Sequence, residues 1–322
     1  MSYIGRLIEV WAGKETTRGT AVAAGTWSSK TNITVKDMTE YVTDEGSIGS
    51  IVDTKNVEVA KVHAEGDLEM NVSINDIGMY LLSLFGSVTS TGASSGAYEH
   101  AFTLSNSNSI QSLTLACIDP VEGDRSYPLA CVNSFTLSVE EWQFVTCSIN
   151  FMSKQSASAS HTSTYAIDYP LLARHSVFKV ATNLAWLDAA SPVCFKSFEI
   201  TFEKNLEPDF CAWSKEPRNF INKQFAVSGS FTAVYEVTTF KDYNLNGTKR
   251  AIRFEIVDAN TTIGATDNPT LSFDMPLVAF TEWDKAQSND EVVTQTLTFK
   301  PLYSTTDWSV CEATLVNTTA SY

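Results

Sequence analysis

Hydrophobic and polar side chains alternate along much of this chain. In residues 62–73 every second position is apolar or glycine, and the positions between them include Glu65, Asp67 and Glu69. Residues 198–203 alternate in the same way. Because successive side chains of a strand point to opposite faces, this spacing predicts half-buried strands in antiparallel sheets with one covered face.

One segment, residues 75–86, has the spacing of an amphipathic helix instead. We predict a helix over these residues, with Asn75 or Asp76 as its amino-terminal cap and Gly86 as its stop. The apolar residues that recur at helical spacing are Ile77, Tyr80, Leu81 and Leu84.

The strand patterns of the first half return in the second half in the same order. Few of the matched residues are identical, but their apolar positions coincide. The matched segments are 33–41 with 200–208, 62–73 with 225–236, 112–120 with 251–259, and 144–154 with 292–302. This repetition favours two copies of one β-rich domain in tandem. The counterpart of the predicted helix, residues 240–248, is polar and is expected to form a loop.

A Ser-rich, weakly apolar stretch, QSASASHTST, separates the two sets of patterns and is typical of a linker. The alternative is one large sandwich in which this stretch is a long loop. In the first interpretation, each half is a separate domain of antiparallel strands. The expected divisions are a first domain over 1–155 with an arm over 1–30, a linker over 156–164, and a second domain over 165–322 with an arm over 303–322.

The chain is acidic: 37 Asp and Glu against 22 Lys and Arg give a formal net charge of −15, which argues against a phosphate-binding protein. It has no apolar run long enough for a membrane helix, and its first residues lack the pattern of a signal peptide. We therefore expect a soluble, non-secreted chain with no membrane insertion. The six cysteines form no C-x-x-C pair, which favours free thiols in the core.

Motifs for catalysis and metal binding are incomplete. Residues 13–20, GKETTRGT, lack the order of a phosphate-binding loop. Residues 242–247, DYNLNG, match the first half of a calcium loop, but its twelfth position is Arg253, so a turn is favoured. No histidine pair has metal-ligand spacing, and no serine or cysteine lies in a nucleophile elbow. We expect a protein that is not an enzyme, with no catalytic residue, cofactor or metal.

With these patterns, the chain resembles the major tail tube proteins of long-tailed bacteriophages, in a tandem-domain form. The blocks that carry the resemblance are GKETTRGTAVAAGTW (13–27), TDEGSIGSI (43–51), VEVAKVHAEGDLEM (57–70), INDIGMYLLSLFGSVTST (74–91), YEHAFTLSNSNSIQSLTL (98–115) and IGATDNPTL (263–271). They span most of the chain, although none has a chemical signature of its own.

The resemblance implies two tandem antiparallel β-sandwich or partial-barrel domains, each with at most one short flanking helix. It also implies a structural protein of the virion tail that is made in the host cytoplasm. Its subunits would form stacked rings around a channel for the phage DNA, and two domains per chain would give trimeric rings with pseudo-sixfold symmetry. A barrel of about 24 strands at about 4.8 Å spacing, tilted by about 40–45°, has a backbone diameter near 50 Å, which leaves a channel of about 40 Å. Other expected partners are tail terminator, tape measure and baseplate proteins.

Acidity would suit such a channel, because carboxylates repel phosphates and offer no counterion-releasing contact. The candidate lumen-facing residues are Glu65, Asp67, Glu69, Glu199 and Glu203. The alternative places these side chains on the outer, solvated face of the sheet.

Contacts between rings are assigned to the two arms and to the long connections 42–58 and 206–224, which could add strands to a neighbour's open sheet edge. The alternative is that they are surface loops and frayed ends. The candidate contact residues are Thr43, Asp44, Glu45, Ile48, Ile51, Phe210, Trp213 and Trp308.

The sequence is also compatible with two other functions. One is a different phage tail, baseplate or decoration protein built from similar sandwich domains. The other is a carbohydrate-binding β-sandwich module, because the seven tryptophans could provide sugar platforms, although core and interface packing is the more common use.

Overall fold

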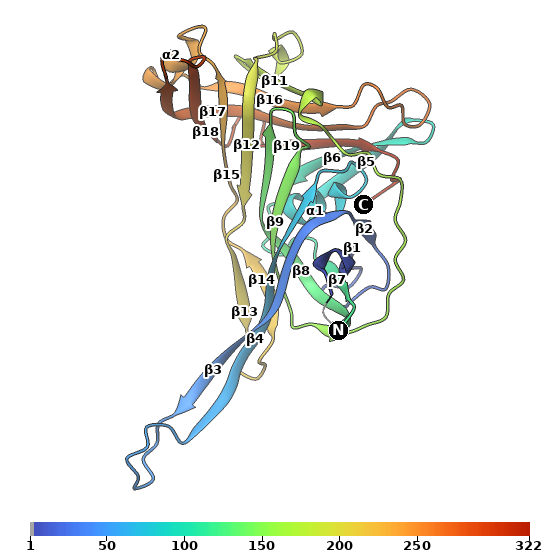
Figure 1. Ribbon diagram of the computed structural model, residues 1–322, viewed down its shortest axis with the longest axis vertical. Coiled ribbons are helices and arrows are strands. Elements are labelled where there is room, and N and C mark those ends of the chain that lie inside the picture. The colour runs from blue at the N-terminus through green and yellow to red at the C-terminus, as the bar shows by residue number, and fades with distance from the viewer. Residues whose placement is uncertain (1–2) are drawn as a thin grey trace.

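The structure is a computed structural model that describes residues 3–322. Antiparallel strands dominate it, and the two α-helices are short. In Figure 1 a long hairpin, β3–β4, projects from the lower end of the molecule, and α2 lies at the upper end. The predicted mainly β, antiparallel fold class is confirmed.

The elements divide into two sets, one from each half of the chain. The first half contains β1 (Glu9–Lys14), β2 (Thr26–Ser28), β3 (Lys30–Asp44), β4 (Asn56–Asn71), α1 (Ile77–Phe85), β5 (Gly86–Ser94), β6 (Ala97–Leu104), β7 (Leu113–Asp119), β8 (Gly123–Glu140), β9 (Thr146–Ser153) and β10 (Ala157–Ser158). The second half contains β11 (Ser176–Ala181), β12 (Phe195–Glu203), β13 (Leu206–Phe210), β14 (Pro217–Asn222), β15 (Ala226–Val234), α2 (Thr239–Leu245), β16 (Arg250–Val257), β17 (Thr270–Ala286), β18 (Thr294–Pro301) and β19 (Glu312–Asn317).

Eight strands form one continuous layer, which we call the eight-strand sheet. The first half contributes β3, β4, β9 and β8 in that order, and the second half continues it with β12, β15, β18 and β17. The two halves therefore use the same pairing order. They join where β12 pairs with β8, from Ser197 opposite Glu140 to Glu203 opposite Ser134.

The long strands β8 and β17 run through this sheet and into a second layer. The first part of β8 pairs with β7, which pairs with β1, and the first part of β17 pairs with β16, which pairs with β11. The β5–β6 hairpin of the first half joins the outer layer of the second half through β19. A large apolar core fills the space between the layers.

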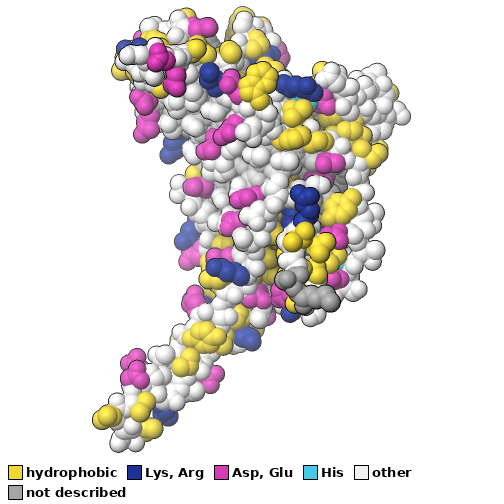
Figure 2. Space-filling model, viewed as in Figure 1, with side chains coloured by type: hydrophobic (Ala, Val, Ile, Leu, Met, Phe, Trp, Pro, Cys, Tyr) yellow, Lys and Arg dark blue, Asp and Glu magenta, His cyan; other side chains and the backbone are white. Residues whose placement is uncertain are grey.

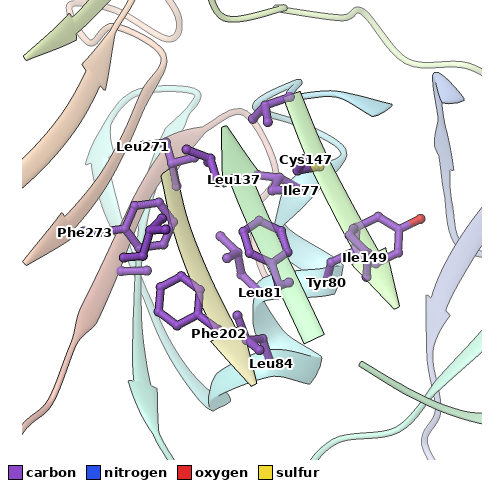
Figure 3. Close-up of a cluster of buried hydrophobic side chains, with 14 of the residues drawn as sticks. Ile77, Tyr80, Leu81, Leu84, Leu137, Cys147, Ile149, Phe202, Leu271 and Phe273 are labelled. Carbon is purple, nitrogen blue, oxygen red and sulfur yellow. The ribbon is translucent and has the colours of Figure 1, made fainter. Parts of the chain in front are cut away.

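Helix α1 forms in the predicted place and packs inside this core. Its apolar residues meet Leu137 of β8, Ile149 of β9 and Phe202 of β12 (Figure 3). The helix ends at Gly86, whose positive φ of 84° suits glycine. Asp76 occupies the N-cap position, one of the two predicted, but its side chain makes no capping bond, and the Asn75 amide donates to the Ile167 carbonyl.

Residues 240–248 are not a loop, although their polarity predicts one. Helix α2 occupies most of this segment and includes part of the DYNLNG stretch, in which the Asp242 carboxylate accepts a hydrogen bond from the Thr238 hydroxyl. Phe240 and Tyr243 anchor the helix against Phe280 of β17. Each half thus has one short helix after its second sheet strand.

The two predicted arms are parts of the fold. Residues Val10, Trp11 and Ala12 of β1 are buried in the sheet with β7, and Ala313 and Leu315 of β19 are buried between β17 and β6. Strand pairing on two sides, not free ends, explains their burial. Of the expected linker, Ala157 and Ser158 form β10 against β8, and the His161 ring packs edge-on against Trp11.

Candidate assembly surfaces

One face of the eight-strand sheet covers the core, and the opposite face is polar. On β4, Ala64, Leu68 and Met70 are buried, while Asp67 and Glu69 between them are exposed. The cross-strand registers place all five predicted acidic residues on this opposite face, which we call the polar face. They come from β4 and β12, on either side of β9 and β8.

Short polar side chains fill the polar face between the acids. The Asn150 amide donates to the Asp67 carboxylate over 2.8 Å, and the Ser138 hydroxyl donates to Glu199 over 3.3 Å. The Thr136 and Thr201 hydroxyls lie 3.0 Å apart across the junction of the two halves. Three further acidic residues lie on this face and were not among the predicted ones: Glu140, Glu282 and Asp284. Glu282 and Asp284 flank the apolar Trp283, and this alternation is the sequence signal that could have identified them.

The eight-strand sheet ends in two open edges. Among the described residues, β3 pairs with β4 alone, and residues 279–286 of β17 pair with β18 alone. Since the strands alternate in direction across the sheet, β3 and β17 run antiparallel to each other. Open edges carry unpaired backbone donors and acceptors, which native proteins cover or use for association.

The predicted contact segment 42–58 forms the tip of the projecting β3–β4 hairpin. Ile48 and Ile51 are exposed there with Thr43, Asp44 and Glu45, and Figure 2 shows hydrophobic side chains at this end. Asp44 forms an ion pair with Lys55 over 3.2 Å, and the backbone N–H of Gly46 and the Lys55 ammonium hold the pKa of Asp44 below its usual value.

The second predicted segment forms the β13–β14 hairpin beside β4. Phe210 is partly buried, because its ring packs against His63 and the Lys61 ammonium. Trp213 and Trp308 are 86% and 76% exposed, and they lie in turns rather than in the core. The structure brings the β13–β14 turn to β4, where the Val62 N–H donates to the Lys215 carbonyl.

A buried lysine supports the junction of the two halves. Lys204 follows β12, and its ammonium donates to the Ser83 carbonyl of α1 over 2.6 Å. Burial lowers the pKa of Lys204 from its usual value to about 7. Burial likewise raises the pKa of Asp76, beside the start of α1, to about 7.

Within residues 3–322, no group of three or more His, Cys, Asp and Glu side chains is placed to hold a metal ion. No helix in that range is long and apolar enough to span a membrane. All six cysteines are free, and four of them are buried.

A family model described as phage tail tube protein matches residues 5–301. The chain belongs to the phage tail tube protein family. No curated protein matches it. The match covers nearly the whole chain, both halves included, and confirms the resemblance drawn from the sequence blocks.

Family membership makes this tail tube protein a structural component of the phage tail, located in the virion. In that setting, the polar face, the open edges and the hairpins are candidate surfaces for assembly.

Proposed function

We propose that three copies of this tail tube protein close into a ring whose two-domain subunits occupy six near-equivalent positions, and that these rings stack into the tail tube. The observation that carries the proposal is the junction between β8 and β12. There, the end strand of one half pairs with the first strand of the other, inside a single chain.

The same junction can form between chains. In the eight-strand sheet, β3 holds the place in the first half that β12 holds in the second, and β17 holds the place of β8. The open edge of β17 is therefore matched to the β3 edge of a neighbour with the antiparallel direction already correct. Three chains of eight strands give a closed barrel of about 24 strands, for which the expected channel is about 40 Å wide.

The polar face would line this channel. The opposite face packs the core and cannot turn inward without exposing Leu68, Phe135 and Phe202. Carboxylates from β4, β12 and β17 would keep DNA centred by repulsion, and the Ser and Thr side chains between them carry no charge to hold a phosphate. DNA would then pass through the tube without adhering to it.

Stacking is assigned to the two hairpins. The β3–β4 tip is exposed on both faces and carries Ile48, Ile51 and Val52, and the neighbouring β13–β14 turn carries Trp213. Exposed apolar groups at one end of a subunit favour a protein partner, and in a tube that partner is the next ring.

Electron microscopy of the purified protein tests ring formation. Rings or open tubes with pseudo-sixfold symmetry and the mass of three chains per ring are expected. Six chains per ring, or a monomer under all conditions that assemble related tails, would contradict the proposal.

A separate variant tests stacking. Replacement of residues 45–55 by a Gly/Ser linker should leave rings that no longer form tubes, because the tip lies outside the core. A matched control replaces the exposed residues 287–291 of the β17–β18 turn in the same way and should leave tube length unchanged. Tubes of normal length from the hairpin variant would remove this hairpin from the stacking contact.

A further inference from the structure

We infer that the ring junction has one register, in which Asp284 of β17 lies directly opposite Lys36 of β3 in the next subunit and forms an ion pair with it. This inference rests on the proposed ring. It follows from irregularities in the strand pairing that recur in the two halves.

β8 and β17 can be aligned on a shared irregularity. The pairing of β8 with β9 shifts register between Val132 and Ser134. The pairing of β17 with β18 shifts between Phe280 and Glu282. Aligning these two shifts equates Ser134 with Glu282.

The cross-strand pairs that start at these two residues extend the alignment to the other strands of each half. The cross-strand neighbours reached from Ser134 are, in order, Asn150, Asp67 and Thr34. Those reached from Glu282 are Thr298, Ser230 and Glu199. Thr34 of β3 therefore corresponds to Glu199 of β12.

A second irregularity checks this result independently. When Thr34 is aligned with Glu199, the register shift in β3 and the register shift in β12 fall at the same place. Each lies between two and four residues before the aligned residue. These shifts fall between Lys30 and Asn32 and between Phe195 and Ser197. An alignment displaced by two residues would separate them.

The register of the ring junction can now be derived from the junction inside the chain. Thr136 of β8 lies opposite Thr201 of β12, with their hydroxyls 3.0 Å apart. Thr136 corresponds to Asp284, and Thr201 corresponds to Lys36. The same register between two chains therefore places Asp284 opposite Lys36.

The chemistry of the two positions fits this pairing. Lys36 and Asp284 are both exposed, both lie on the polar face, and among the described residues neither forms an ion pair. Directly opposite charges stabilise an antiparallel pair, and directly opposite like charges destabilise it. The junction between chains would thus have an ion pair at the position where the junction inside the chain has a neutral Thr–Thr contact. The ion pair would also keep Lys36 from attracting DNA in the channel.

Charge exchange tests the ion pair. Asp284→Lys and Lys36→Asp should each weaken the junction roughly five- to thirty-fold, measured as the subunit concentration at which half of the chains are in rings. The double variant should restore most of the loss. Glu282→Lys is the matched control, because Glu282 is predicted to face Met38, and Lys36→Asp should not rescue it.

Cysteine pairs test the register by geometry. In the double variant Lys36→Cys with Asp284→Cys, oxidation of assembled rings should yield covalent trimers on a non-reducing denaturing gel. Directly opposite Cβ atoms lie about 4.5–5.5 Å apart, near the range of a disulfide, whereas diagonal neighbours are farther apart. Lys36→Cys with Glu282→Cys, and the parent with its native cysteines, should remain monomeric on the gel.

The outcomes separate the register from the ring. If the variant Lys36→Cys with Glu282→Cys forms covalent trimers and the variant Lys36→Cys with Asp284→Cys does not, the register is wrong, although the ring still stands. Failure of the charge exchange to rescue, in a protein that forms rings, would overturn the ion pair. Absence of parental rings would overturn the proposed function itself, and this inference with it.

Discussion

The two halves of this tail tube protein share a strand order but place their charge differently. On the polar face, the first half carries its acidic row on β4, as Glu65, Asp67 and Glu69. The corresponding positions of β15 in the second half are Ser228, Ser230 and Thr232, and there the acids lie on β12 and β17 instead. Repulsion acts over about 8–10 Å at ordinary salt. The channel proposed above would therefore need a sufficient density of negative charge on its wall, but not at particular positions.

The halves also differ in how their helices are covered. α1 lies under β8 and β12, where the chain has closed its own junction, and all but Met79 of its residues are buried. α2 lies against β17, whose edge is open, and Phe240 is its one buried residue. The helix beneath the closed β8–β12 junction is thus buried, and the helix beside the open edge of β17 is mostly exposed.

Removal of β19 should have the largest effect. A chain ending at Ser309 loses the strand between β17 and β6, with the buried Cys311, Ala313 and Leu315. We expect loss of cooperative unfolding and an insoluble product, because both neighbouring strands lose backbone partners. Circular dichroism and solubility measure this, and Trp308→Ser, in the exposed turn just before the deletion, should fold like the parent.

The helices provide the next comparison. Leu81→Ala should lower the free energy of unfolding by about 3 kcal/mol, because it leaves a cavity at a fully buried site. Leu245→Ala in α2, where the side chain is 69% exposed, should change it by less than about 0.5 kcal/mol. Similar losses from the two substitutions in urea titrations would show that the helices contribute equally.

Lys204 should give the closed junction a pH dependence. Its pKa is about 7 in the folded protein and about 10.5 when exposed, so between these values the unfolded chain binds the additional proton. Stability should therefore rise with pH over this window, by an amount on the order of a few kcal/mol. In Lys204→Met that rise should be absent, as measured by urea titrations at pH 7 and pH 10. The same slope in both proteins would rule out Lys204 as its source.

Strand existence could be predicted from the sequence, but register could not. Two of the four matched pairs of segments, 62–73 with 225–236 and 144–154 with 292–302, agree with the positions derived from the strand pairing. The other two are displaced by two residues. A shift of two keeps every side chain on its face, so alternation alone cannot detect it, and the bulges that settle it leave no mark in the pattern.

Two other elements leave too weak a signal in the sequence. Residues 311–317 alternate only from Cys311 to Leu315, and Val316 breaks the pattern, which is too short to mark a strand. α2 has two apolar anchors, Phe240 and Tyr243, within seven residues, too few for a recognisable helical stripe. The acidic rows, in contrast, could be placed on one face because alternation with buried residues is the property that decides the face.

Substitutions in the acidic row of β4 should have the smallest effect on folding and a clear effect on DNA binding. Replacement of Glu65, Asp67 and Glu69 by Ser, Ser and Thr copies the corresponding β15 positions and should leave stability and ring formation unchanged. Replacement of all three by Lys should also leave the core intact, because none of the three is buried in it. The lysine rings should nevertheless bind duplex DNA at low salt, with affinity falling on added salt by about 0.9 in logarithmic slope for each phosphate engaged. Binding measured by DNA retention over a salt series separates the two variants. If the lysine variant binds no more DNA than the serine and threonine variant at any salt concentration, the polar face does not line the channel.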